Sequence, residues 1–279
     1  MKTITAKTER LLELLGHNEM PFGVHYSEEK PDGYGPKPGE IFTRERELSN
    51  EIDWKKAFDN FTCFAGSVWL ARKKRKAAWI SHEECGCMGG GYYTGMYGPY
   101  VDMIVHYVST GIPGTPFEGE HYLPSPESMR SFLEDCAPQL GRGKYCVLKP
   151  LEQFADTVSP LSVTFFVRPE VLIGLHSLTC FTVGSHNAVE SPFGALCTSI
   201  VAWPLVYEQR GIECGVLGGF DPSARKFMKP DELSFSVPFG LYRRMLDHME
   251  TSMLSRHTWE GCRKKVMKSN RAWGEATGN

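Results

Sequence analysis

The sequence predicts an α+β fold with a mixed or mainly antiparallel sheet covered by helices. Helical and strand patterns both occur, but they do not follow the strict β-α-β alternation of a doubly wound sheet. Hydrophobic residues make up 41% and charged residues 23% of the 279 residues, as in a globular chain that buries a sizeable core. We find no internal repeat and no low-complexity segment, so we expect a single domain over residues 1–279.

Hydrophobic periodicity and helix start and stop residues predict the elements of the first half of the chain. Leucines on one face predict a helix over residues 3–16 that ends at Gly16. Residues 53–76 predict a mostly helical segment with Cys63 near its middle. The other expected elements are strand 22–27, loop 28–40, strand 77–82, helix 100–111, and helix 126–136, which Ser125 caps.

The second half alternates between strands and helices. Pro169 opens and Gly184 closes one expected helix, and Pro204 is expected to interrupt a helix that begins near residue 192. A helix is expected over 239–254, and the tail from residue 256 is polar. Strands are expected at 145–151, 162–168, 213–219 and 233–238.

The charge balance excludes some classes of partner. Lys and Arg number 31 against 33 Asp and Glu, so nothing indicates binding to nucleic acid or to an anionic membrane. We expect the basic run at 71–76 to be a solvated helix end, where cations complement the helix dipole. The chain starts without the apolar region of a signal peptide, and no segment is long enough to span a membrane. We expect a cytoplasmic protein that can form a homo-oligomer.

The chain has nine cysteines. In a reducing compartment such thiols are buried hydrophobic residues, metal ligands or redox centres rather than a disulfide framework. The segment SHEECGCMGGGYY (81–93) places Cys85 and Cys87 beside consecutive glycines, where the main chain can approach a bound group closely. We expect its tyrosines to pack in the core.

Four stretches together resemble domain-of-unknown-function family 169, an uncharacterised bacterial and archaeal family. The resemblance spans roughly residues 50–255 and leaves a helix and loop at 1–49 and a polar tail at 256–279. It implies an architecture and a set of positions, and it implies no reaction. The four stretches are TCFAGSVWLARKKRKAAWISHEECGCMGGGYYTGM, LKPLEQFADTVSPLSVTFFVRPEVLIGLH, GALCTSIVAWPL and GGFDPSARKFMKPDELSFSVPFGLYRRML.

The resemblance implies three cysteine positions, which here are Cys63, Cys87 and Cys197. All three lie beside small residues that leave room for a bulky inorganic group. Thiolates hold iron–sulfur clusters, and N–H groups of glycine-rich loops donate hydrogen bonds to cluster sulfurs. We therefore expect a 4Fe–4S type cluster bound by these cysteines beside Gly89 and Gly90.

The sequence leaves the role of Cys85 open. With three thiolates, one iron can bind a substrate, whereas Cys85 as a fourth metal ligand would favour electron transfer to a redox partner. The Cys85/Cys87 pair can instead serve a thiol redox enzyme. A zinc site is disfavoured because the cysteines and histidines lack finger-like spacing. A non-catalytic small-ligand-binding or accessory protein with structural cysteines also agrees with the sequence.

The segment GGFDPSARKF has a local explanation. Asp221 stands before a proline, so we expect it to cap a helix start and to pair with Arg225 one turn later.

Overall fold

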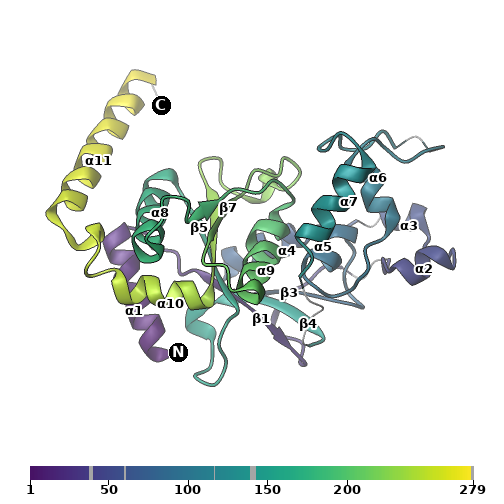
Figure 1. Cartoon of the computed structure of the whole chain (residues 1–279), viewed down its shortest axis with the longest axis horizontal. Coiled ribbons are helices and arrows are strands. Elements are labelled where there is room, and N and C mark those ends of the chain that lie inside the picture. The colour runs from purple at the N-terminus through teal and green to yellow at the C-terminus, as the bar shows by residue number, and fades with distance from the viewer. Residues whose placement is uncertain (38–39, 60, 116, 139–142, 278–279) are drawn as a thin grey trace.

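A computed structural model of the chain describes residues 1–37, 40–59, 61–115, 117–138 and 143–277 (Figure 1). In this part of the chain the strands are β1 (Phe22–Ser27), β2 (Gly33–Tyr34), β3 (Ala77–Ser81), β4 (Tyr145–Pro150), β5 (Ser162–Val167), β6 (Val189–Glu190), β7 (Gly215–Gly218) and β8 (Leu233–Pro238). They form one eight-stranded sheet in the order β2-β3-β4-β1-β5-β8-β7-β6. The edge pairs β2/β3 and β6/β7 are parallel and the other pairs are antiparallel. The α+β class and the mixed, mainly antiparallel sheet are as predicted.

The helices cover both faces of the sheet. They are α1 (Lys2–Leu15), α2 (Arg44–Leu48), α3 (Trp54–Asp59), α4 (Phe64–Lys74), α5 (Met88–Tyr93), α6 (Asp102–Val108), α7 (Pro126–Asp135), α8 (Pro169–Val183), α9 (Trp203–Arg210), α10 (Phe239–His248) and α11 (His257–Thr277). Short 3-10 turns lie at η1 (Leu151–Gln153), η3 (Arg225–Phe227) and η4 (Met253–Ser255), and η2 (Thr198–Ala202) is a π-helix that runs directly into α9. In Figure 1, α8, α10 and α11 lie toward one end of the molecule and α5, α6 and α7 toward the other.

Side chains that alternate along β5 separate two hydrophobic clusters, because successive residues of a strand point to opposite faces. Val163 and Phe165 join the cluster that also contains residues of α1, α8 and α10. Phe166 joins the cluster formed with α4, α5, α6 and α7. On this second face, Thr164 donates a hydrogen bond to the carbonyl oxygen of Ile200 in η2, at 3.2 Å, so the π-helix lies directly on the sheet.

The sheet consists of two halves with the same topology. Exchanging β1 with β5, β2 with β6, β3 with β7 and β4 with β8 reproduces both the strand order and the direction of every pair. The two halves meet at the antiparallel pair β1/β5. This approximate two-fold relation lies in the topology and not in the residue pattern, in which we find no repeat.

The strand register repeats as well. The first residue of β1 pairs with the proline that ends β4 (Phe22 with Pro150), and the first residue of β5 pairs with the proline that ends β8 (Ser162 with Pro238). Leu148, two residues before Pro150, pairs with Ala78, the second residue of β3. Ser236, two residues before Pro238, likewise pairs with Val216, the second residue of β7. A matching register on both sides of the central pair supports a duplicated unit rather than a chance similarity of strand order.

Several predicted elements are confirmed. Helix α1 ends at Gly16 and helix α8 ends at Gly184, and both glycines adopt the left-handed conformation that such a helix end favours. Ser125 caps α7 by accepting a hydrogen bond from the N–H of Ser128. The expected strands at 22–27, 77–82, 145–151, 162–168, 213–219 and 233–238 are present with bounds that differ by a few residues at most.

Other predicted elements are wrong in detail. Residues 53–76 form two helices, α3 and α4, and the expected loop 28–40 contains the short strand β2; residues 38–39 and 60 lie outside the described residues. Pro204 lies where the π-helix η2 passes into α9, so the helical run changes type beside the proline and continues past it. The expected helix over 239–254 ends at His248, and the polar tail is the long helix α11.

The basic run at the end of α4 is not solvated throughout. The guanidinium of Arg72 donates hydrogen bonds to Glu19 and Glu232, with N–O distances of 2.7 to 2.9 Å, and lies 4.0 Å from the ring centroid of Phe166. This buried network ties α4 of the first half to the turn before β8 in the second half. None of the helices in the described part of the chain combines the length and the apolar character that crossing a membrane requires.

Candidate functional site

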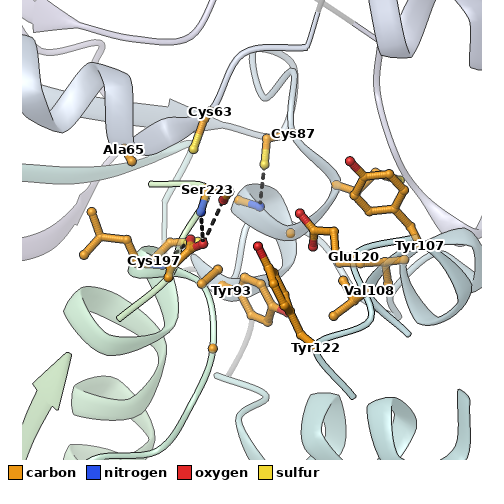
Figure 2. A pocket seen from close by; sticks show the side chains of 18 of the residues that line it. Cys63, Ala65, Cys87, Tyr93, Tyr107, Val108, Glu120, Tyr122, Cys197 and Ser223 are labelled. Atoms are coloured by element: carbon orange, nitrogen blue, oxygen red, sulfur yellow. Dashed lines mark hydrogen bonds between the residues drawn. The ribbon is translucent and has the colours of Figure 1, made fainter. Parts of the chain in front are cut away.

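A cavity of about 110 Å³ lies on the sheet face covered by α4, α5 and η2, and residues from both halves of the chain line it (Figure 2). Its wall is mainly apolar and aromatic. Three cysteines, Glu120 and Asp221 also line it, and the lining contains no Lys, Arg or His among the described residues. The cavity therefore combines soft thiol ligands and two carboxyl groups with a mainly apolar wall.

The three thiols of the cavity come from three helix starts. Cys63 immediately precedes α4, Cys87 immediately precedes α5 and Cys197 immediately precedes η2. Cys63 is thus the N-cap of a helix and does not lie in the middle of one. The first N–H groups of a helix have no partner within it, so these positions favour an electron-rich group. The N–H of Gly90 already donates to the Sγ of Cys87 at 3.2 Å.

The fold explains why these distant cysteines meet. Helix α4 leads into β3, and the continuous helix η2–α9 leads into β7, the equivalent strand of the other half. Cys63 and Cys197 therefore start equivalent helices. Cys87 lies in the connection after β3, and α5 contacts η2, which brings this third thiol to the same place. The resemblance implied these three positions, and the structure brings all of them to one cavity.

The glycines after Cys87 allow α5 to pack closely around the thiols. A Cβ atom on Gly90 would lie 3.2 Å from Cδ1 of Ile80 and 3.3 Å from Sγ of Cys87. A Cβ atom on Gly89 would lie 2.8 Å from the ring of Tyr93. Gly89 and Gly90 both line the cavity. A larger residue at Gly90 would press on the thiol of Cys87, and one at Gly89 would displace the ring of Tyr93.

Burial dominates the electrostatics of the thiols. It raises the pKa of Cys63, Cys87 and Cys197, and the charge of Cys63 further raises the pKa of Cys87. For Cys197, the neighbouring thiols Cys87 and Cys63 are the next causes of the raised pKa after burial. The three thiols are thus close enough to interact and hold their protons at neutral pH until a metal replaces these protons.

Cys85 does not line the cavity. Its thiol donates a hydrogen bond to the carbonyl oxygen of Cys87 at 2.8 Å, and a Cβ atom on Gly91 would lie 2.8 Å from its sulfur, so Cys85 lies on the Gly91 side of α5. Burial raises the pKa of Cys85 to about 11. A nucleophilic thiol needs a lowered pKa and access to substrate, so this environment gives no support to a Cys85/Cys87 redox pair.

Asp221 closes the turn at residues 221–224, in line with the expected cap, and it also lines the cavity, which was not expected. Its buried carboxylate accepts hydrogen bonds from the N–H of Leu196 at 3.1 Å and from the N–H and hydroxyl of Ser223 at 2.9 and 2.8 Å. Arg225, expected as its ion-pair partner, instead donates to carbonyl oxygens, including those of Glu232 and Lys229. Asp221 thereby fixes the segment that carries Cys197.

Glu120 is the second carboxyl group of the cavity. Figure 2 shows it on the other side of the cavity from Cys63, near Tyr122. Burial raises the pKa of Glu120 to about 7, and the charge of Asp221 adds to this effect. Residue 120 belongs to a loop without periodicity, so no signal in the sequence identifies it.

The other cysteines and the tyrosines after Cys87 mostly lie in the hydrophobic core. All nine cysteines are free thiols, and Cys136 and Cys146 are fully buried elsewhere in the core. The hydroxyls of Tyr92 and Tyr97 donate to carbonyl oxygens, as expected for core packing, while Tyr93 lines the cavity. Within the described ranges, no three His, Cys, Asp or Glu side chains are placed to hold a single metal ion.

The fold and this cavity define an α+β protein with a duplicated sheet topology and a pocket lined by three cysteines that stand at the starts of helices. The chain belongs to domain-of-unknown-function family 169 (DUF169), described as uncharacterised ArCR, whose sequence profile matches residues 10–248. The family domain thus begins within α1, earlier than the boundary near residue 50 that the resemblance indicated, and ends before α11. Comparison with curated proteins and with solved structures finds no match.

Proposed function

We propose that this protein binds an iron–sulfur cluster of the 4Fe–4S type through Cys63, Cys87 and Cys197 and uses it in redox chemistry. The observation that carries the proposal is the position of the three thiols. Each stands at the start of a different helix, and all three line one cavity. Cysteines that only fill the core are not expected to gather at helix starts around one cavity, because a buried thiol is equally favourable anywhere in the core.

The arrangement favours a polynuclear group over a single ion. Zinc requires about four ligands within roughly 2.0–2.3 Å of one point. No three His, Cys, Asp or Glu residues in the described part of the chain satisfy that condition. A cluster distributes its ligands over several irons, so its cysteines stand farther apart.

The local electrostatics also favour a cluster. Three thiolates give the bound group a net negative charge, which the N-terminal ends of α4 and of the continuous helix η2–α9 stabilise. The N–H of Gly90, which points at Cys87 Sγ, is of the kind that lowers the energy of a reduced cluster. The apolar wall limits water access and thereby tunes the reduction potential.

Anaerobic purification followed by reconstitution with iron and sulfide tests the proposal. We expect a brown protein with about four irons and four sulfides per chain and a charge-transfer band in its absorption spectrum. Cys63→Ser, Cys87→Ser and Cys197→Ser each lower cluster content, whereas Cys85→Ser and Cys146→Ser, which alter buried thiols outside the cavity, retain it. A colourless wild-type protein without bound iron after reconstitution refutes the proposal.

The second candidate is a non-catalytic small-ligand-binding protein with structural cysteines. The aromatic and apolar wall, which includes Tyr107, Tyr122 and Phe193, favours it because such walls are typical of small-molecule pockets. In that case the cysteine variants differ from wild type only in stability, and a screen of small apolar molecules raises the Tm of the iron-free protein.

A further inference from the structure

We infer that Asp221 is the fourth protein ligand of the cluster, so that the site is built from three cysteines and one carboxylate. This inference rests on the proposed function and extends it to the iron that lacks a cysteine. Three features of Asp221 support it: its place in the topology, the hydrogen bonds of its carboxylate and the absence of Lys, Arg and His from the described lining of the cavity.

The two-fold relation between the halves accounts for four positions. Cys63 and Cys197 start the helices that precede β3 and β7. Cys87 lies in the connection that follows β3, and Asp221 lies in the connection that follows β7. The four side chains thus form two pairs, one at the helix starts and one in the connections after the equivalent strands. All four line the same cavity.

The hydrogen bonds of Asp221 leave one coordination position free. Its Oδ1 accepts from the N–H and from the hydroxyl of Ser223, which uses both lone pairs of that oxygen. Its Oδ2 accepts from the N–H of Leu196 only, so one lone pair remains. Oδ2 is therefore the ligand atom, and Ser223 and Leu196 orient the carboxylate as outer partners do around metal ligands.

The carboxylate of Asp221 is buried in a cavity whose described lining carries no cation. The residue is 5% exposed, and no Lys, Arg or His belongs to that lining. An iron ion at Oδ2 would place a positive charge beside this carboxylate, which is a favourable pairing in a buried site.

A carboxylate-bound iron is expected to be labile. Oxygen is a harder donor than sulfur, so this iron is held less tightly than the three on cysteines. If Cys63, Cys87, Cys197 and Asp221 hold a [4Fe–4S]²⁺ cluster, removal of one electron by ferricyanide and release of one Fe²⁺ would leave [3Fe–4S]⁺ on the three cysteines. The charges balance, and the three-iron product has a distinct EPR signal. The same iron is the position at which an external ligand can replace Oδ2.

The experiment compares reconstituted wild type with Asp221→Cys, Asp221→Ala and the control Glu118→Gln, which removes an exposed carboxyl group outside the cavity. Iron content and the three-iron EPR signal are followed during titration with ferricyanide. We expect wild type and Glu118→Gln to lose one iron, Asp221→Ala to lose it faster, and Asp221→Cys to retain four. Ser223→Ala, which frees the carboxylate without removing it, loses iron about tenfold faster than wild type.

Equal iron loss and equal EPR signals in wild type, Asp221→Ala and Asp221→Cys overturn the assignment of Asp221 and leave the three-cysteine site intact. A wild-type protein that takes up no cluster overturns both. If Asp221→Ala does not fold, Asp221→Cys decides the question, because retention of four irons requires a ligand at this position. The far-UV circular dichroism of each variant verifies its fold.

Discussion

Cys63 and Cys197 occupy equivalent places in the two halves of the sheet, because each immediately precedes the helix that leads into the third strand of its half. Both helices therefore begin at the cavity. Their unpaired N–H groups and the positive ends of their dipoles lie at the thiols. A duplicated topology thus converts two distant cysteines into neighbours, and the third thiol, Cys87, is added by the connection after β3.

The close packing of α5 is testable with a small substitution. In Gly90→Ala the new methyl group lies 3.2 Å from Ile80 and 3.3 Å from the sulfur of Cys87, tighter than ordinary contacts. We expect it to lower the free energy of unfolding by about 1–3 kcal/mol and to reduce cluster content. Chemical denaturation measures the first effect and iron analysis the second.

Gly261→Ala is the matched control for this substitution. Gly261 lies in α11, and a Cβ atom there meets nothing within 4 Å. Alanine favours helix more than glycine does, so this variant is expected to gain about 0.5–1 kcal/mol. An unchanged stability of Gly90→Ala would show that α5 can shift away from Cys87 without cost.

The network around Arg72 is expected to hold the two halves together. Arg72→Met leaves Glu232, whose side chain is 2% exposed, without its bidentate partner. Loss of one partner from a buried ion pair costs about 3–5 kcal/mol. Thermal and urea unfolding measure the loss, and Lys74→Met, at an exposed position of the same helix, is expected to change stability by no more than about 0.5 kcal/mol.

The same network makes stability depend on acid pH. Burial opposes ionisation of Glu232, but the hydrogen bonds and the charge of Arg72 outweigh it, and the pKa of Glu232 is lowered. Its contribution to stability is therefore present above the ordinary pKa of about 4.5 and is lost as the pH falls through the lowered value. Unfolding between pH 6 and pH 3 is expected to show a steeper loss of stability in wild type than in Arg72→Met; equal slopes contradict the assignment.

Glu120 is expected to give stability the opposite dependence on pH from Glu232. Its pKa is raised to about 7, so the folded state holds the proton more tightly than the unfolded chain does. Its contribution to stability is complete at pH values below about 4.5 and is lost as the pH rises through about 7. Glu120→Gln removes this dependence and is more stable than wild type at pH 8, as measured by denaturant midpoints.

Glu118→Gln is the control for the loss of one negative charge, because Glu118 is an exposed residue of the same loop. It is expected to retain the pH dependence of wild type between pH 5 and pH 8. A Glu120→Gln curve that follows the wild-type curve over this range would mean that the carboxyl group is hydrated in the folded protein.

Cluster formation is expected to increase with pH. Burial raises the pKa of Cys63, Cys87 and Cys197, and each thiol must release a proton when it binds iron. Reconstitution at pH 8.5 is therefore expected to incorporate more iron than reconstitution at pH 6.5. Cys85→Ala keeps this dependence because Cys85 does not line the cavity. A yield that does not vary with pH argues against ligation by these thiols.

The local elements of the fold follow from the sequence. Gly16 and Gly184 end their helices because glycine tolerates the left-handed conformation, and Ser125 caps α7 because its hydroxyl reaches a free N–H group. Each of these effects acts within one turn of helix. The α+β class and the strands are predictable for the same reason, since periodicity is a property of neighbouring residues.

The site required the tertiary structure. Cys85 and Cys87 are two residues apart in the sequence, yet only Cys87 reaches the cavity, because the thiol of Cys85 lies on the Gly91 side of α5. Glu120 carries no local signal, and the local signal at Asp221 predicts a cap rather than a cavity residue; their proximity depends on the tertiary fold. By itself the sequence determined which segments become helices and strands and, through its resemblance to a family, which cysteines matter. Only the pairing of β1 with β5 decided where those cysteines meet, because contacts between distant segments arise from packing and not from the order of residues.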